Sequence, residues 1–474
     1  MTQDPVAQWA ETLAEARLPI LRSTRELVVR LADDSRASMK DVGRALHQDP
    51  VMALAVVRMA NARDQKRLRN ELTTLDQAAM MLGLGRLAEH VKALPTIEDL
   101  IPRPVQAHLR RVMGRSYYAS LLAGTWAQVR HDMIPTEVSL GALLYNIGEI
   151  ALWTRIPAQM AELAVTKDRC RVPAHEAEYV VLGFALEPLS HRLAQGWNLP
   201  PMVLESMEAR HAQELRTLGV MLAAQLSRHA FSGWRDPYFV QDLDLAAEYL
   251  HVSLDDLTNS VNGITQQFNK LADHYDLPAL TALSGELIAA ARERMQKGSG
   301  RILCLAPRQD ILRALQGRLA KGEGEAVRTA LEALHHGLGL NRAVFARLGG
   351  ERDAPVLVAE SLIGTDYQPH FNRFRLPLGG NGLFEALMKK PSAVWINAQN
   401  RAKLWPLVPE EVKALISVDS FYAMSVFAQG KPVGLLYADR HSRACQLDAR
   451  AFEDFKRVGA LTAKALEPAA KGAR

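Results

Sequence analysis

The chain has 474 residues, and its 57 lysine and arginine residues against 52 aspartate and glutamate residues give a formal net charge of +5. Hydrophobic residues make up 48% and charged residues 23%, the composition of an ordinary soluble globular protein of about two to four domains. The small basic excess gives no reason to expect nucleic-acid binding. No apolar run approaches the ~18 residues that span a bilayer, which excludes a transmembrane helix.

The chain contains three cysteines, Cys170, Cys304 and Cys445. They are odd in number and far apart in the sequence, which excludes a dense disulfide framework and a CxxC metal cluster. A reducing compartment suits such a chain. The N-terminal residues show neither the basic segment nor the apolar segment of a signal peptide. We therefore expect a cytoplasmic protein without membrane contact.

Residues 1–277 are predicted to form an all-helical domain. Asp49 and Pro50 make a good helix start, since an aspartate can cap exposed amides and proline fits the first turn. Residues 74–77, Thr-Leu-Asp-Gln, have the form of a capping box, and Gly83 follows where that helix should end. Apolar residues at helical spacing predict further helices at 107–129, 137–152, 158–166, 174–195, 201–209, 215–231, 242–250 and 253–274.

Residues 278–300 are predicted to connect two domains. Residues 283–295 have the pattern of an amphipathic helix, and Lys-Gly-Ser-Gly at 297–300 then breaks the pattern as a linker would.

Residues 301–474 are predicted to form an α+β domain. A helical stretch at 308–338 precedes short runs typical of strands, and Gln-Gly-Lys-Pro at 429–432 predicts a hairpin turn between the last two. Asp448 should then cap a final amphipathic helix. The expected strands are 343–348, 356–360, 374–378, 394–397, 421–428 and 433–438.

Several motifs of the first region occur together in a recognisable order. They are Leu-His-Gln-Asp-Pro-Val at 46–51, Val-Arg-Met-Ala-Asn-Ala at 57–62, Leu-Leu-Tyr-Asn-Ile-Gly at 143–148 and Trp-Asn-Leu-Pro at 197–200. Over residues 15–275 this order and spacing resemble the HDOD domain, the HD-related output domain of bacterial signalling proteins. The resemblance implies a helical HD-like fold.

The same resemblance implies a degenerate metal site. HD hydrolases hold their metal with a first histidine, a His-Asp pair and a later histidine or aspartate. Arg115 falls at the first position, Tyr145 and Asn146 replace the pair, and Leu186 stands at a later histidine position. Only His211, near the family's paired histidines, could still be a ligand. An amide carries no charge and a phenol stays protonated near pKa ~10, so both are poor metal ligands. We expect no metal, no cofactor and no catalysis.

The C-terminal region resembles a GAF domain, a module that binds small molecules or dimerises. The resemblance depends on Gly-Leu at 382–383, Phe-Tyr-Ala-Met-Ser-Val at 421–426 and Pro-Val-Gly-Leu-Leu-Tyr-Ala-Asp at 432–439. It implies a ligand sensor, for a small molecule or a nucleotide, or a dimerisation module that would make the chain a homodimer.

These observations favour a non-catalytic signal-transduction protein. Its HDOD region would be a scaffold for other signalling proteins, and its GAF-like region a sensor or dimerisation module. Tyr145 and Asn146 would then be hydrogen-bonded within a helical core. The alternative is a metal-dependent phosphodiesterase acting on a nucleotide or cyclic dinucleotide through a shifted ligand set such as His175, His191 and His211.

Overall fold

The computed structural model describes residues 4–34, 36–64, 73–168, 172–296, 303–351, 354–379, 382–441 and 445–467. The chain divides into two compact units. The first comprises residues 1–171 and 177–300, and the second comprises residues 172–176 and 301–474. Among the described residues, none of the helices is both long and apolar enough to span a membrane.

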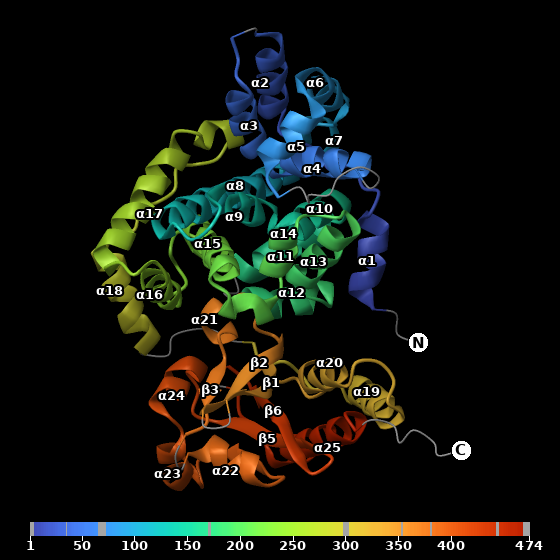
Figure 1. Cartoon of the computed structure of the whole chain (residues 1–474), viewed down its shortest axis with the longest axis vertical. Coiled ribbons are helices and arrows are strands. Elements are labelled where there is room, and N and C mark those ends of the chain that lie inside the picture. The colour runs from blue at the N-terminus through green and yellow to red at the C-terminus, as the bar shows by residue number, and fades with distance from the viewer. Residues whose placement is uncertain are drawn as a thin grey trace. The chain divides into compact units, whose positions relative to one another are not determined.

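The first unit is helical, as predicted (Figure 1). Its core is built around the long helix α8, which packs against α9 and α15. Its helices are α1 (Pro5–Leu13), α2 (Arg22–Asp33), α3 (Met39–His47), α4 (Pro50–Asp64), α5 (Leu75–Leu82), α6 (Leu84–Ala93), α7 (Ile97–Leu100), α8 (Arg103–Arg130), α9 (Pro135–Leu144), α10 (Ile147–Arg155), α11 (Pro157–Asp168), α12 (Ala174–Leu182, from residue 177 on), α13 (Leu186–Gly196), α14 (Pro201–Ser206), α15 (Leu215–Phe231), α16 (Phe239–Leu250), α17 (Leu254–Asn269) and α18 (Gly285–Gln296), with 3-10 turns η1 (Ala209–Gln213) and η2 (Ala272–Tyr275).

The predicted helix starts are confirmed at two places. The carboxylate of Asp49 accepts hydrogen bonds from the amides of Val51 at 2.9 Å and Met52 at 3.0 Å, which caps α4. Thr74 and Gln77 form the predicted capping box at the start of α5. These helix starts are encoded locally, because each needs only residues that lie within one turn of one another.

Two of the expected helices are each divided into two α-helices, and the helix expected at 253–274 ends at Asn269 before the 3-10 turn η2. The helix expected at 174–195 breaks after Leu182, where Gly183 has a φ of +83°, a left-handed conformation that favours glycine. The helix expected at 137–152 breaks between α9 and α10, at Tyr145 and Asn146. Its apolar pattern continues across the break, so periodicity alone could not reveal it.

The second unit contains a six-stranded antiparallel sheet with the strand order β3-β2-β1-β6-β5-β4. All six expected strands are present, with ends that differ by a few residues from those predicted. A two-residue turn, Gln429 and Gly430, joins β5 to β6. The strands are β1 (Arg342–Glu351), β2 (Ala354–Ile363), β3 (Arg375–Pro377), β4 (Ala393–Ile396), β5 (Phe421–Ala428) and β6 (Lys431–Asp439).

Helices cover both faces of this sheet (Figure 1). Alternate strand residues supply the two cores, since successive side chains of a strand point to opposite faces. Leu435 and Tyr437 belong to one core, whereas Leu436 and Ala438 belong to the other. The first core includes residues of α21 (Pro369–Asn372), α22 (Leu383–Lys389) and α24 (Glu410–Ile416), and the second includes residues of α19 (Gln309–Lys321), α20 (Ala326–Glu332), the π turn η3 (Ala333–Gly337) and α25 (Ala449–Ala465). The short α23 (Arg401–Leu404) and the turn η4 (Trp405–Leu407) complete the unit.

Two of the cysteines are paired in the structure. Cys304 and Cys445 form a disulfide across a sequence separation of 141 residues. Cys170 lies outside the described residues. Distance along the sequence therefore excluded a disulfide framework but did not exclude a single disulfide.

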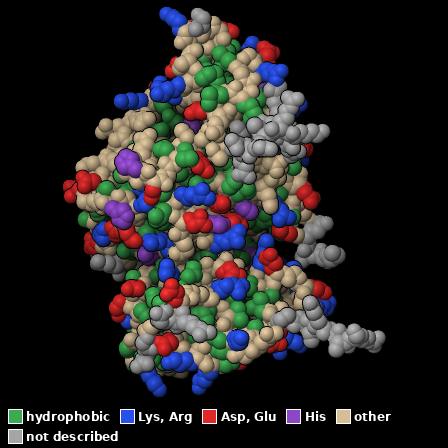
Figure 2. Space-filling view, in the orientation of Figure 1, with side chains coloured by type: hydrophobic (Ala, Val, Ile, Leu, Met, Phe, Trp, Pro, Cys, Tyr) green, Lys and Arg blue, Asp and Glu red, His purple; other side chains and the backbone are tan. Residues whose placement is uncertain are grey.

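On the face that Figure 2 shows, basic and acidic side chains are interspersed. This surface does not concentrate positive charge in the way that a nucleic-acid-binding face usually does.

Candidate functional site

The break between α9 and α10 places two polar side chains inside the helical unit. Tyr145 follows the last residue of α9, and Asn146 immediately precedes α10 with a φ of −98° and a ψ of 22°. Tyr145 is 5% exposed and Asn146 is 2% exposed. Buried polar groups of this kind need hydrogen-bond partners, because water cannot supply them.

Asn146 finds its partners on other helices. Its Oδ1 accepts a hydrogen bond from Arg115 of α8 at 3.1 Å and another from Arg228 of α15 at 2.9 Å. Its Nδ2 donates to the hydroxyl of Ser116 at 3.1 Å. Two guanidinium groups therefore converge on one amide oxygen.

Two buried carboxylates lie near these cations, and a third binds the neighbouring Tyr145. Arg115 also donates to the carboxylate of Glu149, one turn into α10. Glu178 lies 3.9 Å from the Nζ of Lys167 and accepts a hydrogen bond from the amide of Leu186 at 2.9 Å. The hydroxyl of Tyr145 donates to Glu187. We call Arg115, Asn146, Glu149, Lys167, Glu178 and Arg228 the buried ion network.

The network shifts the pKa values of its two carboxyl groups, Glu149 and Glu178, in opposite directions. Burial opposes ionisation of Glu149, but the charges of Arg115, Lys167 and Arg228 outweigh it and hold its pKa at about 2. Burial also raises the pKa of Glu178, and the opposing charges of Lys167 and Arg228 do not cancel that effect. Glu149 is thus the strongly held anion of the network.

The pKa of Glu149 leads to a prediction about stability at acid pH. A carboxyl whose folded-state pKa of about 2 lies below its ordinary 4.5 stabilises the fold above pH 4.5 and loses that contribution as the pH falls toward 2. The contribution is ~3 kcal/mol, at ~1.4 kcal/mol per pKa unit. Glu149→Gln should abolish this part of the pH dependence, so the gap in free energy of unfolding between wild type and variant should narrow between pH 5 and 3. Urea denaturation followed by circular dichroism would measure it, and a constant gap would contradict the assignment.

The donor set does not fit a divalent metal ion. Protein ligands for such ions are neutral imidazoles and ionised carboxylates. Here the amide oxygen of Asn146 and the carboxylate of Glu149 are already bound by guanidinium groups, which are permanently cationic and would repel a metal ion. Over the described ranges, no three histidine, cysteine, aspartate or glutamate side chains are placed to hold a metal.

The other sequence-predicted residues lie elsewhere. Leu186 is a buried apolar residue, 2% exposed, at the start of α13, and its amide donates to Glu178 of the network. His211 lies in η1, with its Nδ1 2.7 Å from Glu214 and its Nε2 3.2 Å from Glu208. The structure therefore joins Arg115 and Asn146 by a hydrogen bond, whereas His211 contacts Glu208 and Glu214.

Two histidines of the shifted set share one acidic partner in the first unit. His191 and His211 both approach Glu208, at 3.7 and 3.2 Å from their Nε2 atoms. His175 belongs to the segment 172–176 that groups with the second unit, and its Nδ1 lies 2.5 Å from Asp366.

Sequence reasoning missed Glu149, Lys167, Glu178 and Arg228. Glu149 could have been recognised from the sequence, because it interrupts the apolar run Ile-Gly-Glu-Ile-Ala-Leu-Trp at 147–153. A charged residue on a buried helix needs a partner. Its partner, Arg115, is 34 residues away on another helix, and no local pattern identifies it.

Gly148 lets α10 approach α13, and this contact gives a second prediction. Its amide donates to the hydroxyl of Ser190 at 3.1 Å, and a Cβ on Gly148 would lie 2.7 Å from that hydroxyl and 2.9 Å from the Ser190 backbone nitrogen. Gly148→Ala should therefore lower the free energy of unfolding by ~1–3 kcal/mol.

The matched control is Gly196→Ala at the end of α13, where an added Cβ meets nothing within 4 Å. Its expected effect is neutral or slightly stabilising. Equal effects of the two substitutions in thermal denaturation would show that the contact with Ser190 does not constrain the helix.

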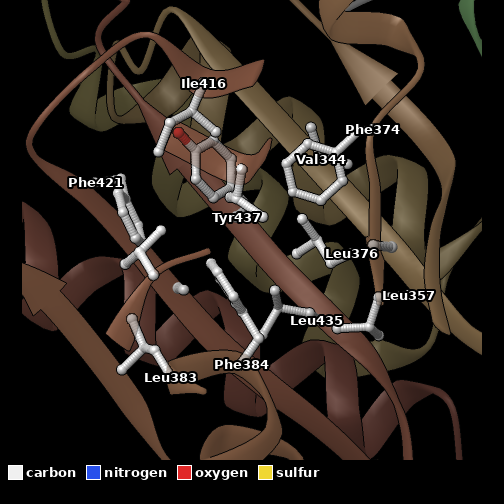
Figure 3. Packing of buried hydrophobic residues seen from close by; sticks show 14 of the residues in the cluster. Val344, Leu357, Phe374, Leu376, Leu383, Phe384, Ile416, Phe421, Leu435 and Tyr437 are labelled. Carbon is white, nitrogen blue, oxygen red and sulfur yellow. The ribbon is translucent and has the colours of Figure 1, made fainter. Parts of the chain in front are cut away.

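In the second unit, aromatic and aliphatic side chains pack together on one face of the sheet (Figure 3). The rings of Phe421 and Tyr437 lie 5.2 Å apart between centroids, those of Phe374 and Tyr437 5.3 Å, and those of Phe384 and Phe421 6.2 Å. Each of these residues is at most 3% exposed. These side chains pack between the strands and the covering helices.

Comparison with known families identifies one region of the chain. Residues 18–213 match the model of the HDOD domain. Tyr145, Asn146, Glu149 and Glu178 lie inside this match, and Arg228 lies beyond it. A comparison with the curated proteins found no match.

Solved structures similar to the chain include signalling proteins. The MmoQ response regulator of Methylococcus capsulatus str. Bath is 18% identical, with 52% of this chain and 97% of that one covered at a TM-score of 0.40. A virulence factor of Campylobacter jejuni is 17% identical, with 56% and 100% covered at 0.43. The phycoerythrobilin-bound GAF domain of a cyanobacterial phytochrome is 17% identical, with 34% and 95% covered at 0.26. Together, the family match and the helical fold show that residues 18–213 form an HDOD domain.

Proposed function

We propose that this protein is a non-catalytic signal-transduction protein whose HDOD domain is a scaffold for other signalling proteins. The observation that carries the proposal is the buried ion network. Arg115 and Arg228 bind the oxygen of Asn146, a residue that, by the sequence resemblance, stands where an HD hydrolase has a metal ligand. Guanidinium groups supply fixed positive charge there without a Lewis acid or an activated water.

The network also supports the proposed scaffold role, because it connects separate helices of the domain. Arg115, Asn146 and Arg228 come from three separate segments, α8, the α9–α10 break and α15. Their hydrogen bonds connect these segments within the core, as buried polar groups require. A rigid helical body of this kind suits a docking surface.

Metal analysis and a hydrolysis assay on the purified full chain test the proposal. We expect far less than one equivalent of Fe, Mn or Zn per chain, and no hydrolysis of cyclic dinucleotides or nucleotides above that of a Tyr145→Ala/Asn146→Ala control in the presence of added metal. Stoichiometric metal that is lost in a His211→Ala variant, or turnover that the control lacks, would support the alternative metal-dependent phosphodiesterase instead.

For the GAF-like second unit, we propose a packing or dimerisation module in preference to a small-molecule sensor. Support comes from the aromatic core, in which Phe374, Phe421 and Tyr437 are fully buried. A ligand entering this face would have to displace them. We expect no change in melting temperature with a panel of nucleotides, because only a ligand that binds the folded state raises it. A nucleotide-dependent rise would favour the sensor role.

A further inference from the structure

Cys304 and Cys445 bring together two segments of the second unit that are remote in the sequence. Their Cα atoms lie 5.4 Å apart and their side chains form a disulfide. This separation is within the ~4.4–6.8 Å that disulfides span without moving the backbone. Cys304 lies in the segment that precedes α19, and Cys445 lies between β6 and α25.

The segment around Cys304 is also held by hydrogen bonds. Asn341 donates to the carbonyl of Leu303 at 3.0 Å, and Arg440 donates to that of Leu305 at 3.3 Å. The amide of Arg308 donates to the carbonyl of Gly337 at 2.8 Å. Reduction of the disulfide would therefore leave this segment positioned against the sheet, with both thiols still near one another.

The two sulfurs differ in their access to solvent. Cys304 is exposed, whereas Cys445 is 5% exposed. A thiolate from solution can reach a disulfide only at an accessible sulfur, so exchange would begin at Cys304. We propose that Cys304 and Cys445 form a reversible thiol–disulfide modification site.

The reaction is an exchange with a small-molecule disulfide such as oxidised glutathione. The Cys304 thiolate attacks one glutathione sulfur, which breaks the glutathione disulfide, forms a mixed disulfide and releases one glutathione thiolate. The Cys445 thiolate then attacks the Cys304 sulfur and releases the second. Two protein thiols are oxidised, one glutathione disulfide is reduced to two thiols, and the two protons pass from the cysteines to glutathione.

The disulfide lies near the start of the larger part of the second unit. The larger part of the second unit begins at residue 301, and the disulfide lies three residues later. Oxidation thus crosslinks the start of this part covalently to the segment between β6 and α25. This inference does not depend on the proposed function, since neither cysteine belongs to the buried ion network.

The test is equilibration of the full chain in glutathione buffers of increasing oxidised fraction, followed by alkylation and intact-mass analysis. We expect a single transition in which the chain loses the mass of two hydrogen atoms and two alkylation sites. Hydrogen exchange at residues 303–308 should be on the order of tenfold slower in the oxidised form, because the crosslink restricts local opening.

Cys304→Ser and Cys445→Ser should each abolish the transition, whereas the matched control Cys170→Ser should retain it. Cys304 is exposed, so its variant should fold. Two outcomes would overturn the proposal: both thiols staying open to alkylation in the most oxidising buffer, or a disulfide that forms without slowing exchange at residues 303–308.

Discussion

Arg115→Met should lower the free energy of unfolding by ~3–5 kcal/mol, because it leaves the Glu149 carboxylate buried without its nearest cation. The side chains of Arg115 and Glu149 are only 11% and 7% exposed, so water cannot replace the lost contact. Asn146 would also lose one of the two guanidinium donors on its Oδ1. Urea denaturation followed by circular dichroism at a helical wavelength measures the change, since the first unit is helical.

Two further variants distinguish the cost of leaving Glu149 unpaired from the cost of removing any arginine from this helix. Arg110→Met on the same helix removes ion pairs to Glu98 and Asp276, whose side chains are 26% and 81% exposed and can be solvated. It should cost about 1 kcal/mol or less. The double variant Arg115→Met/Glu149→Met should recover most of the loss, because no unpaired carboxylate remains. If Arg115→Met and Arg110→Met cost the same, the network does not support the core as proposed.

Asp439→Ala should destabilise the sheet unit by a similar ~3–5 kcal/mol. Asp439 is fully buried and faces Arg342 across the β1–β6 pairing, with its Oδ2 2.7 Å from a guanidinium nitrogen. It also accepts hydrogen bonds from the hydroxyl of Tyr437 and the amide of His441, each at 2.6 Å. Removal of this carboxylate would leave a guanidinium, a hydroxyl and an amide to find new partners in the core.

Hydrogen exchange of the β1 and β6 amides would report this loss within the second unit, independently of the helical unit. The matched control is Glu360→Ala, which removes an exposed cross-strand ion pair with Arg347 on the same sheet. Exposed pairs contribute about 0–1 kcal/mol, so exchange in this control should change little. Comparable acceleration in both variants would show that the Arg342–Asp439 pair is no more important than a surface contact.

The elements of the fold were predictable because their signals are local. The Asp49 cap and the capping box at Thr74 depend on residues within one helical turn, and the strands β5 and β6 depend on a hairpin turn and apolar runs. The helix break that the sequence did not predict also has a physical explanation. The break at Tyr145 and Asn146 occurs within an apolar pattern that suits one continuous helix, and the polar contacts on other helices that accompany the break are not visible in that pattern.

The candidate site was predicted only in part. The resemblance of residues 143–148 to a metal-site motif directed attention to Tyr145 and Asn146, and the chemistry of their side chains argued against a metal. The reading of both as hydrogen-bonded core residues agrees with their contacts. Arg115 was marked as a lost ligand, whereas the structure makes it a bridge between Asn146 and Glu149.

By itself, the sequence determined a helical region followed by an antiparallel α+β region, with an HDOD-like order of motifs in the first. The tertiary structure alone decided that Arg115 and Arg228 converge on Asn146, that Cys304 pairs with Cys445, and that Phe374, Phe421 and Tyr437 meet on one face of the sheet. The reason is one of range. Periodicity and capping act over a few residues, whereas a buried charge or thiol acquires its role from partners dozens to hundreds of residues away, which only the folded chain brings within a few ångströms.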